Sequence, residues 1–244
     1  MKAMVLAAGE GTRLRPLTLT VPKVLLPVAG VPVIRHTLAW LGSHGIREVA
    51  INLHHLGDMV RDALGDGSDL GMRIVYSPEV DILGTAGGVK RMAHFFDGPF
   101  VVHYGDVLTD FDLSEMVRFH EEKEAQATLS ILRVSSPRSA GVVELDADSR
   151  VVSFKEKPSA RRQAMDLENG GTYVLERGVL DCIPPEGPAD FGLDVIPALL
   201  AKSLPVFGYL LKDDDYLIDI GTPEKYRQAN EDMAAGKLRT GRGQ

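Results

Sequence analysis

The residues best suited to chemistry lie in one stretch near the start of the chain, between Leu6 and Lys23. Gly9 and Gly11 allow the backbone to curl around a phosphate with its N–H groups pointing inward. Arg13 and Lys23 follow, and a guanidinium grips phosphate oxygens through two hydrogen bonds whereas an ammonium supplies a mobile point charge. Position 14 is Leu where the dinucleotide fingerprint needs Gly, and the Gly-Lys-Ser/Thr of the Walker loop is absent. The stretch therefore predicts a phosphate-binding loop of another type.

Two aspartates stand where short apolar strands are predicted to end. Asp106 follows the apolar run 100–104, Asp219 lies in the run 216–220, and each has a glycine within two residues. A carboxylate at the carboxyl end of a strand is well placed to hold Mg²⁺ against triphosphate oxygens. The alternative for Asp219 is a helix cap, but Thr222 is the closer candidate for capping the helix that follows.

The elements that must position these residues alternate between apolar runs and helical patterns. In the first half, strands are predicted at 3–7, 49–53, 73–76 and 100–104, and helices at 31–45, 56–64, 88–95 and 113–124. This alternation predicts an α/β fold with a mostly parallel central sheet flanked by helices. Beyond residue 127 the predicted strands are 128–134, 140–145, 151–156, 172–175 and 216–220, and the predicted helices are 193–202 and 223–235. Closely spaced strands there predict an added antiparallel or mixed section.

Composition limits the class of protein. The chain has 244 residues, 44% of them hydrophobic and 25% charged, which is typical of a folded globular protein. Its formal net charge of −7 argues against nucleic acid as a partner. The single cysteine, Cys182, excludes an intrachain disulfide. No apolar stretch reaches the ~18 residues of a membrane span, and the apolar start is too short for a signal peptide, so we expect a cytoplasmic protein without a membrane partner.

Eight short motifs follow one another along the chain. They are Gly9-Glu-Gly-Thr-Arg13, Pro22-Lys23, Leu25–Ile34, Leu83–Gly87, Gly105-Asp106, Glu156-Lys-Pro158, Asn169–Tyr173 and Ile218–Pro223. In this order they resemble the signature of sugar-1-phosphate nucleotidylyltransferases, and most of all the catalytic domain of mannose-1-phosphate guanylyltransferases. The resemblance implies a Rossmann-like nucleotidyltransferase fold. It also implies Mg²⁺-dependent transfer of a nucleotidyl group from an NTP to a sugar 1-phosphate, with release of pyrophosphate.

The resemblance also implies roles for particular residues. The expected catalytic residues are Arg13, Lys23, Asp106 and Asp219, and the two aspartates are the expected Mg²⁺ ligands. The expected nucleotide-binding residues are Ala7, Ala8, Gly9, Gly11, Thr12, Gly84, Thr85 and Gly87. The expected sugar-phosphate-binding residues are Gly141, Glu156, Lys157 and Asn169. We expect a single domain over 1–235, with a nucleotide-binding part at about 1–127, a sugar-phosphate-binding part at about 128–222, a frayed tail at 236–244 and no C-terminal β-helix domain.

The substrates are less constrained than the chemistry. The resemblance favours GTP with mannose 1-phosphate or a related sugar phosphate, and Glu10 could accept hydrogen bonds from guanine if its loop turns inward. A solvated Glu10 is the alternative. Departures from the family pattern lie mostly around the sugar, at Ala8, Ala140, Gly170, Thr172 and Leu217. A UTP- or dTTP-dependent enzyme, including one that uses N-acetylmuramate 1-phosphate, therefore stays open, and a homodimer is allowed.

Two hypotheses from other classes also stay open. A nucleotide-sugar-dependent glycosyltransferase would use Asp110-Phe-Asp112, but it leaves Arg13 and Lys23 without a role. A non-catalytic nucleotide-sugar sensor would not need the cation that faces the leaving group. The pair His54-His55 looks like a metal site, but adjacent residues at a strand end point to opposite faces, so we do not expect one ion between them.

Overall fold

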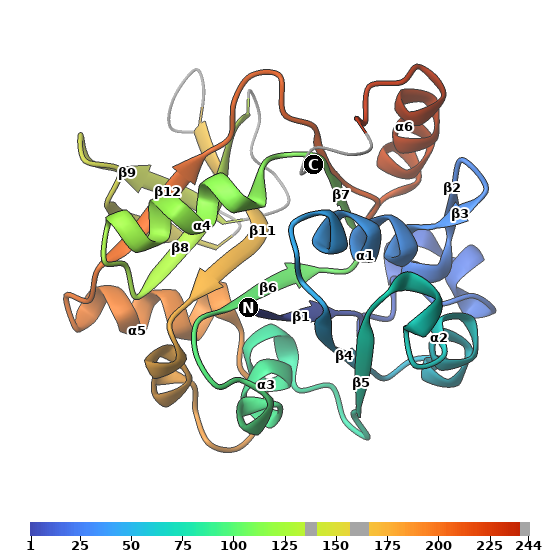
Figure 1. The fold of residues 1–244 in the computed structure, drawn as a ribbon, viewed down its shortest axis with the longest axis horizontal. Coiled ribbons are helices and arrows are strands. Elements are labelled where there is room, and N and C mark those ends of the chain that lie inside the picture. The colour runs from blue at the N-terminus through green and yellow to red at the C-terminus, as the bar shows by residue number, and fades with distance from the viewer. Residues whose placement is uncertain (135–140, 157–165, 240–244) are drawn as a thin grey trace. The chain divides into compact units, whose positions relative to one another are not determined.

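The computed structural model describes residues 1–134, 141–156 and 166–239 (Figure 1). The chain divides into two compact units. The first comprises 1–82, 103–113 and 214–244, and the second comprises 83–102 and 114–213. Strand β6 (Phe100–Tyr104) carries the chain from the second unit back into the first. No helix in the described ranges combines the length and the apolar character that crossing a bilayer requires.

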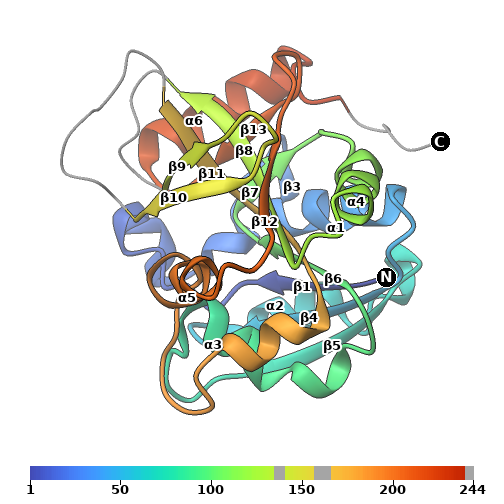
Figure 2. The same cartoon turned by 90° about the vertical axis from the view of Figure 1, so that its left-hand side faces the viewer.

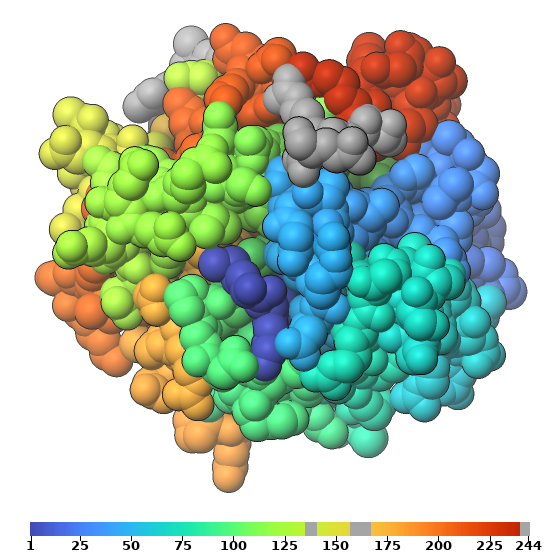
Figure 3. All heavy atoms as spheres, viewed as in Figure 1, coloured from blue at the N-terminus to red at the C-terminus, as the bar shows by residue number. Residues whose placement is uncertain are grey.

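The first unit is built on three parallel strands. These are β1 (Lys2–Leu6), β4 (Glu48–Leu53) and β5 (Arg73–Pro78), with β4 in the middle. Ala3, Met4 and Val5 of β1 are fully buried, as expected of a parallel strand that is covered on both faces. Helices α1 (Val33–Ser43) and α2 (Gly57–Leu64) belong to the same unit, and both reach its surface in the space-filling view (Figure 3).

Short elements complete the first unit. They are the hairpin β2 (Pro27–Val28) and β3 (Val31–Pro32), the antiparallel pair β7 (Val107–Thr109) and β13 (Leu217–Asp219), and helix α6 (Pro223–Ala234). One apolar cluster packs Leu14 and Leu26 against Leu108 of β7 and Ala229 of α6. Because this cluster joins the segment after β1 to β7 and α6, it brings stretches that are distant in sequence, and that carry the predicted catalytic residues, to one place.

The second unit contains a mixed sheet centred on β8 (Ala127–Val134). Strand β11 (Asp166–Leu175) pairs with β8 antiparallel, β12 (Val206–Leu210) pairs with β8 parallel, and β9 (Val142–Leu145) joins β11 to β10 (Val151–Lys155), as Figure 2 shows. The helices of this unit are α3 (Gly84–Arg91), α4 (Leu113–Glu122) and α5 (Ile196–Ala201). This is the added mixed section that the strand spacing predicted.

The predicted fold class is confirmed, and the corrections concern where elements begin. Helix α3 begins at Gly84 rather than at 88, because the glycine-rich segment is itself helical. Strand β11 begins at Asp166 rather than at 172. The helix predicted from 193 begins at Ile196, after a π-helical turn at Phe191–Val195. Sequence periodicity did not predict β7 or β12.

Candidate active site

The loop that follows β1 starts from a buried polar network. The backbone N–H of Ala7 donates to Asn52 Oδ1 at 2.8 Å, and Asn52 Nδ2 donates to Glu79 Oε1 at 2.8 Å. Asn52 lies in β4 and Glu79 directly follows β5, and both side chains are buried. The network ties the carboxyl ends of three parallel strands together, which is the edge where ligands bind in open α/β sheets. Sequence reasoning missed Asn52 and Glu79, although an Asn inside the apolar run 49–53 was the available signal.

Gly11 is required where the loop turns. Its φ is +64°, and an added Cβ would lie 2.9 Å from Thr18 Cγ2 and 3.1 Å from Lys23 Cβ. The hydroxyl of Thr18 donates to the Gly11 carbonyl at 2.8 Å, which closes the loop on itself. Gly9, in contrast, has open space around it, and it is exposed. The predicted curl of backbone between β1 and Lys23 is therefore present, and it holds Thr12 and Arg13 in an exposed 3₁₀ turn at Thr12–Leu14.

The four residues predicted to be catalytic form one group, in which three lie close to Gly221 and the fourth, Asp106, pairs with one of those three. Lys23 is ion-paired with Asp106. A Cβ added to Gly221 would lie 2.6 Å from Asp219 Oδ1, 2.8 Å from Arg13 Nη2 and 3.3 Å from Lys23 Nζ. The Gly221 N–H donates to the same Asp219 oxygen at 3.0 Å. One carboxylate and two cations thus lie close to one glycine, although Arg13 and Asp219 are 206 residues apart in the chain, and the Lys23 ion pair adds Asp106 to the group.

The short ladder between β7 and β13 brings the two aspartates together. Asp219 pairs in register with Val107, the neighbour of Asp106, and the Ile220 N–H donates to the Asp106 carbonyl at 3.0 Å. Thr222 caps α6 through a hydrogen bond that its hydroxyl accepts from the Lys225 N–H at 3.3 Å. The predicted N-cap is confirmed, which leaves the Asp219 carboxylate available for other partners.

A further cation, Lys225, was missed by the sequence analysis. Its ammonium forms an ion pair with Asp219. Burial raises the pKa of Asp219, but the hydrogen bond and the charge of Lys225, helped by the charge of Lys23, outweigh burial and lower it. Asp219 is therefore held as a carboxylate. The available signal was the place of Lys225 in the first turn of α6, directly after the run Ile218–Pro223.

The chemistry of this group fits a magnesium ion that is bound together with phosphates. Mg²⁺ is commonly held by one or two protein carboxylates, with the remaining positions filled by water and substrate phosphates. Asp106 and Asp219 supply such a pair, whereas the described ranges contain no cluster of three or more His, Cys, Asp or Glu side chains. His54 and His55 do not form a metal pair, because His54 bonds the Glu79 carbonyl at 3.0 Å and His55 the Thr18 carbonyl at 2.9 Å.

In the second unit, the predicted nucleotide-binding glycines support the start of α3. The N–H groups of Ala86 and Gly87 donate to the Ala189 carbonyl at 2.9 and 3.1 Å. Gly84 has φ +74° and approaches that carbonyl so closely that no side chain would fit. The Thr85 hydroxyl donates to Asp190 Oδ2 at 2.8 Å and accepts from the Phe191 N–H at 3.0 Å. These residues tie α3 to the segment 189–191.

The structure brings two of the predicted sugar-binding residues together. The Asn169 N–H donates to the Gly141 carbonyl at 2.9 Å, and Asn169 Nδ2 bonds the Tyr173 hydroxyl at 2.6 Å. The carboxylate of Glu156 lies against Gly192, at the π-helical turn. Lys157 and Ala140 lie outside the described residues.

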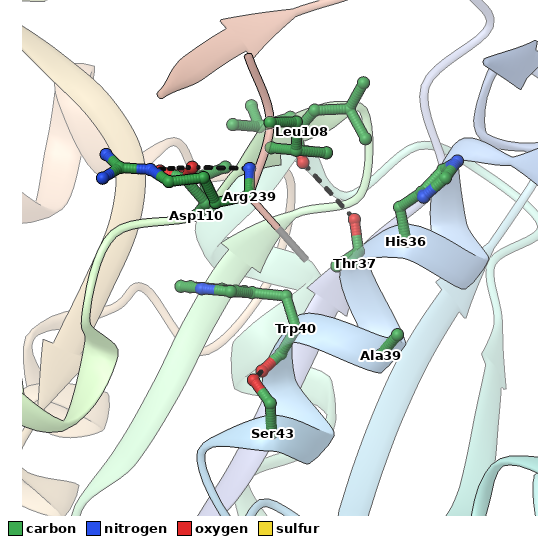
Figure 4. A pocket seen from close by; sticks show the side chains of 11 residues that line it. His36, Thr37, Ala39, Trp40, Ser43, Leu108, Asp110 and Arg239 are labelled. Carbon is green, nitrogen blue, oxygen red and sulfur yellow. Dashed lines mark hydrogen bonds and ion pairs between the residues drawn. The ribbon is translucent and has the colours of Figure 1, made fainter. Parts of the chain in front are cut away.

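The first aspartate of the Asp-x-Asp motif, on which the glycosyltransferase hypothesis depends, already accepts hydrogen bonds from other residues. Asp110 is buried, and it accepts from the Tyr216 N–H at 2.8 Å and from the N–H and Nε of Arg239 at 2.9 and 3.3 Å. Asp110 and Arg239 line a cavity of about 180 Å³ into which Thr37 and Trp40 project from α1 (Figure 4). The described residues that line this cavity include none of those expected to bind the nucleotide, the sugar phosphate or Mg²⁺. Asp110 therefore anchors the segment around Arg239 rather than facing a metal.

Three comparisons with known proteins agree on the family. Residues 2–236 match the family model described as nucleotidyl transferase. The chain is 39% identical over 236 residues to the mannose-1-phosphate guanylyltransferase of Mycobacterium tuberculosis, covering 96% of this chain and 65% of that protein. It is 38% identical over 243 residues to the UTP–glucose-1-phosphate uridylyltransferase of Synechocystis, covering 94% of this chain and 62% of that protein. The chain thus spans less than two thirds of the length of these curated relatives.

Solved structures show the same fold. The crystal structure of HddC from Yersinia pseudotuberculosis complexed with GMP-PN superimposes with a TM-score of 0.81 at 25% identity, covering 95% of this chain and 99% of that one. The structure of a putative glucose-1-phosphate thymidylyltransferase from Bacillus anthracis superimposes with a TM-score of 0.83 at 25% identity, covering 95% and 94% of the two chains. The folds agree although the nucleotides named for these proteins differ.

Proposed function

We propose that this chain, which belongs to the nucleotidyl transferase family, transfers a nucleotidyl group from an NTP to a sugar 1-phosphate and releases pyrophosphate. The observation that carries the proposal is the group formed by Arg13, Lys23 and Asp219 at Gly221, together with Asp106, which pairs with Lys23. A triphosphate needs cations for its oxygens and carboxylates for its metal ion, and this group supplies both.

The reaction follows from these charges. An oxygen of the sugar phosphate attacks the α-phosphorus in line, a new P–O bond forms, and the bond to the β-phosphate oxygen breaks. Arg13 stabilises the charge that develops on the departing pyrophosphate, while Lys23 and Lys157 would each neutralise charge on a reacting phosphate. Asp106 and Asp219 would hold Mg²⁺, which supplies further charge neutralisation when it is bound. Positioning and electrostatic stabilisation account for catalysis, with no covalent enzyme intermediate.

The sugar phosphate is proposed to bind in the second unit. Gly141 and Asn169 are adjacent there, and Asn169 carries an amide that can both donate to and accept from sugar hydroxyls. Glu156 would accept from further hydroxyls, and Lys157 would pair with the phosphate.

GTP with mannose 1-phosphate is the proposed substrate pair. The guanylyltransferase of M. tuberculosis and the GMP-PN complex of HddC support it, and the uridylyltransferase of Synechocystis supports UTP as the main competitor. Glu10 does not contribute to the argument for guanine, because its carboxylate pairs with Arg15 at 3.1 Å in an exposed position. Gly84 and Gly87 do not support a purine either, because a Cβ added to Gly84 would meet the Ala189 backbone and one added to Gly87 would meet the backbones of Ala189 and Gly187.

The test is pyrophosphate release from a matrix of five NTPs against a panel of sugar 1-phosphates. We expect kcat/KM for GTP to exceed that for UTP by at least about tenfold, or roughly 1.4 kcal/mol. An equal or reversed preference would refute the guanylyl assignment alone. If no combination releases pyrophosphate, the proposed nucleotidylyltransferase activity is refuted, and a sensor or a glycosyltransferase is favoured.

The metal assignment has its own test. Asp106→Asn and Asp219→Asn should each abolish Mg²⁺-dependent pyrophosphate release, because an amide has nearly the same shape as a carboxylate but lacks its charge. Circular dichroism checks that both variants fold. Near-wild-type turnover of either one would contradict the assignment.

A further inference from the structure

Each of the two expected metal ligands already faces a lysine of its own. Lys23 pairs with Asp106, and Lys225 pairs with Asp219. With Arg13 beside Gly221, three cations stand against two carboxylates, so the group has a net charge of +1. A divalent cation that arrives alone would meet a positive site whose carboxylates are both engaged. A metal–triphosphate complex, which is negatively charged, would be attracted to the same site.

The position of Lys225 is set by the helix rather than by its ion pair. Its N–H donates to the capping hydroxyl of Thr222 at 3.3 Å, which places the residue in the first turn of α6. A cation there opposes the helix dipole, which favours acidic residues in the first turn. Asp219 offsets this cost, and removing the lysine side chain leaves the cap in place.

The side chain of Lys225 is also more exposed than that of Lys23. It is 37% exposed, whereas that of Lys23 is 13% exposed. A lysine carries a compact charge on a flexible stem, so its ammonium can exchange a carboxylate oxygen for a phosphate oxygen and keep a charge-assisted hydrogen bond.

We propose that Lys225 occupies Asp219 in the free protein, keeps a divalent ion from binding alone, and moves onto a phosphate oxygen when a metal–triphosphate complex enters. Lys225 is thus a positioning residue that makes metal binding depend on the nucleotide. The inference rests on the proposed function, since it needs a triphosphate as ligand. No covalent bond is made or broken in this exchange, and the lysine stays charged throughout.

The experiment measures Mn²⁺ binding to the full chain by electron paramagnetic resonance, with and without inorganic tripolyphosphate as the probe. Lys225→Ala should bind Mn²⁺ alone at least about tenfold more tightly than wild type, because a unit charge beside a partly exposed carboxylate is removed. The same variant should bind the Mn²⁺–tripolyphosphate complex at least about threefold more weakly. Lys225→Arg keeps the charge and should retain the weak binding of Mn²⁺ alone.

The matched control is Arg227→Ala, on the same helix. Arg227 pairs with Glu231 at 2.9 Å, and the variant should leave both affinities unchanged. Unchanged or weaker binding of Mn²⁺ alone by a folded Lys225→Ala variant overturns the inference, whereas pyrophosphate release by wild type keeps the proposed function standing. If wild type binds no Mn²⁺ even with tripolyphosphate and releases no pyrophosphate, the inference and the proposed function both fall.

Discussion

Gly221→Ala tests whether the charged ends around this glycine form the reacting site. The Gly221 backbone is outside the left-handed region, so alanine causes no backbone strain. The three heavy atoms nearest to the added Cβ are the ends of the flexible side chains of Asp219, Arg13 and Lys23. The Asp219 oxygen, 2.6 Å from that Cβ, must retreat by about 0.8 Å to reach an ordinary contact of 3.4 Å, and the Arg13 nitrogen, at 2.8 Å, by about 0.6 Å.

Displacements of this size matter to catalysis far more than to folding. A misplacement of about 1 Å can cost about 10²-fold in rate, so we expect kcat to fall by about 10²-fold, or roughly 2.7 kcal/mol of transition-state stabilisation. The melting temperature should stay within about 2 °C of wild type, because side-chain ends can move at little cost. Pyrophosphate release and differential scanning calorimetry measure the two quantities.

The matched control is Gly98→Ala, where an added Cβ meets no heavy atom within 4 Å and φ is not positive. It should leave both turnover and melting temperature unchanged. Wild-type turnover of Gly221→Ala would show that the gathered charges are not the reacting site. A melting temperature that falls along with turnover would show that Gly221 acts through stability instead.

Two further predictions concern stability. Thr222→Ala removes the hydroxyl that caps α6, so the unfolding free energy should fall by about 1 kcal/mol and the melting temperature by about 2–4 °C. Calorimetry measures both quantities, and an unchanged melting temperature would contradict a stabilising role for the cap. Burial lowers the pKa of His103 to about 4, although its hydrogen bond to the Val107 carbonyl raises it in part. Between about pH 6.5 and pH 4, this histidine is therefore protonated in the unfolded chain and neutral in the folded chain. Urea unfolding should therefore show about 2 kcal/mol less stability from this residue at pH 5 than at pH 7, and His103→Gln should remove that loss; an equal pH dependence in the variant would refute it.

The sequence alone predicted the parts of the site that depend on local pattern. The stretch from Gly9 to Lys23 was recognisable because its residue types and their spacing predict a turned loop followed by cations. The parallel strands were recognisable because short, continuous apolar runs are typical of strands buried on both faces. Asp106 and Asp219 were recognisable because each stands at the end of such a run beside a glycine.

Only the tertiary structure decided which partners these side chains have. The ladder between β7 and β13 sets Asp219 beside Asp106, yet β7, its unpredicted strand, has three residues, too few to show a period. Lys225 meets Asp219 because the Thr222 cap fixes where α6 begins. Asp110, an apparent metal motif in the sequence, is instead engaged by Arg239, 129 residues later. Long-range electrostatic pairing depends on how the chain folds back on itself, and local residue patterns do not encode that distance.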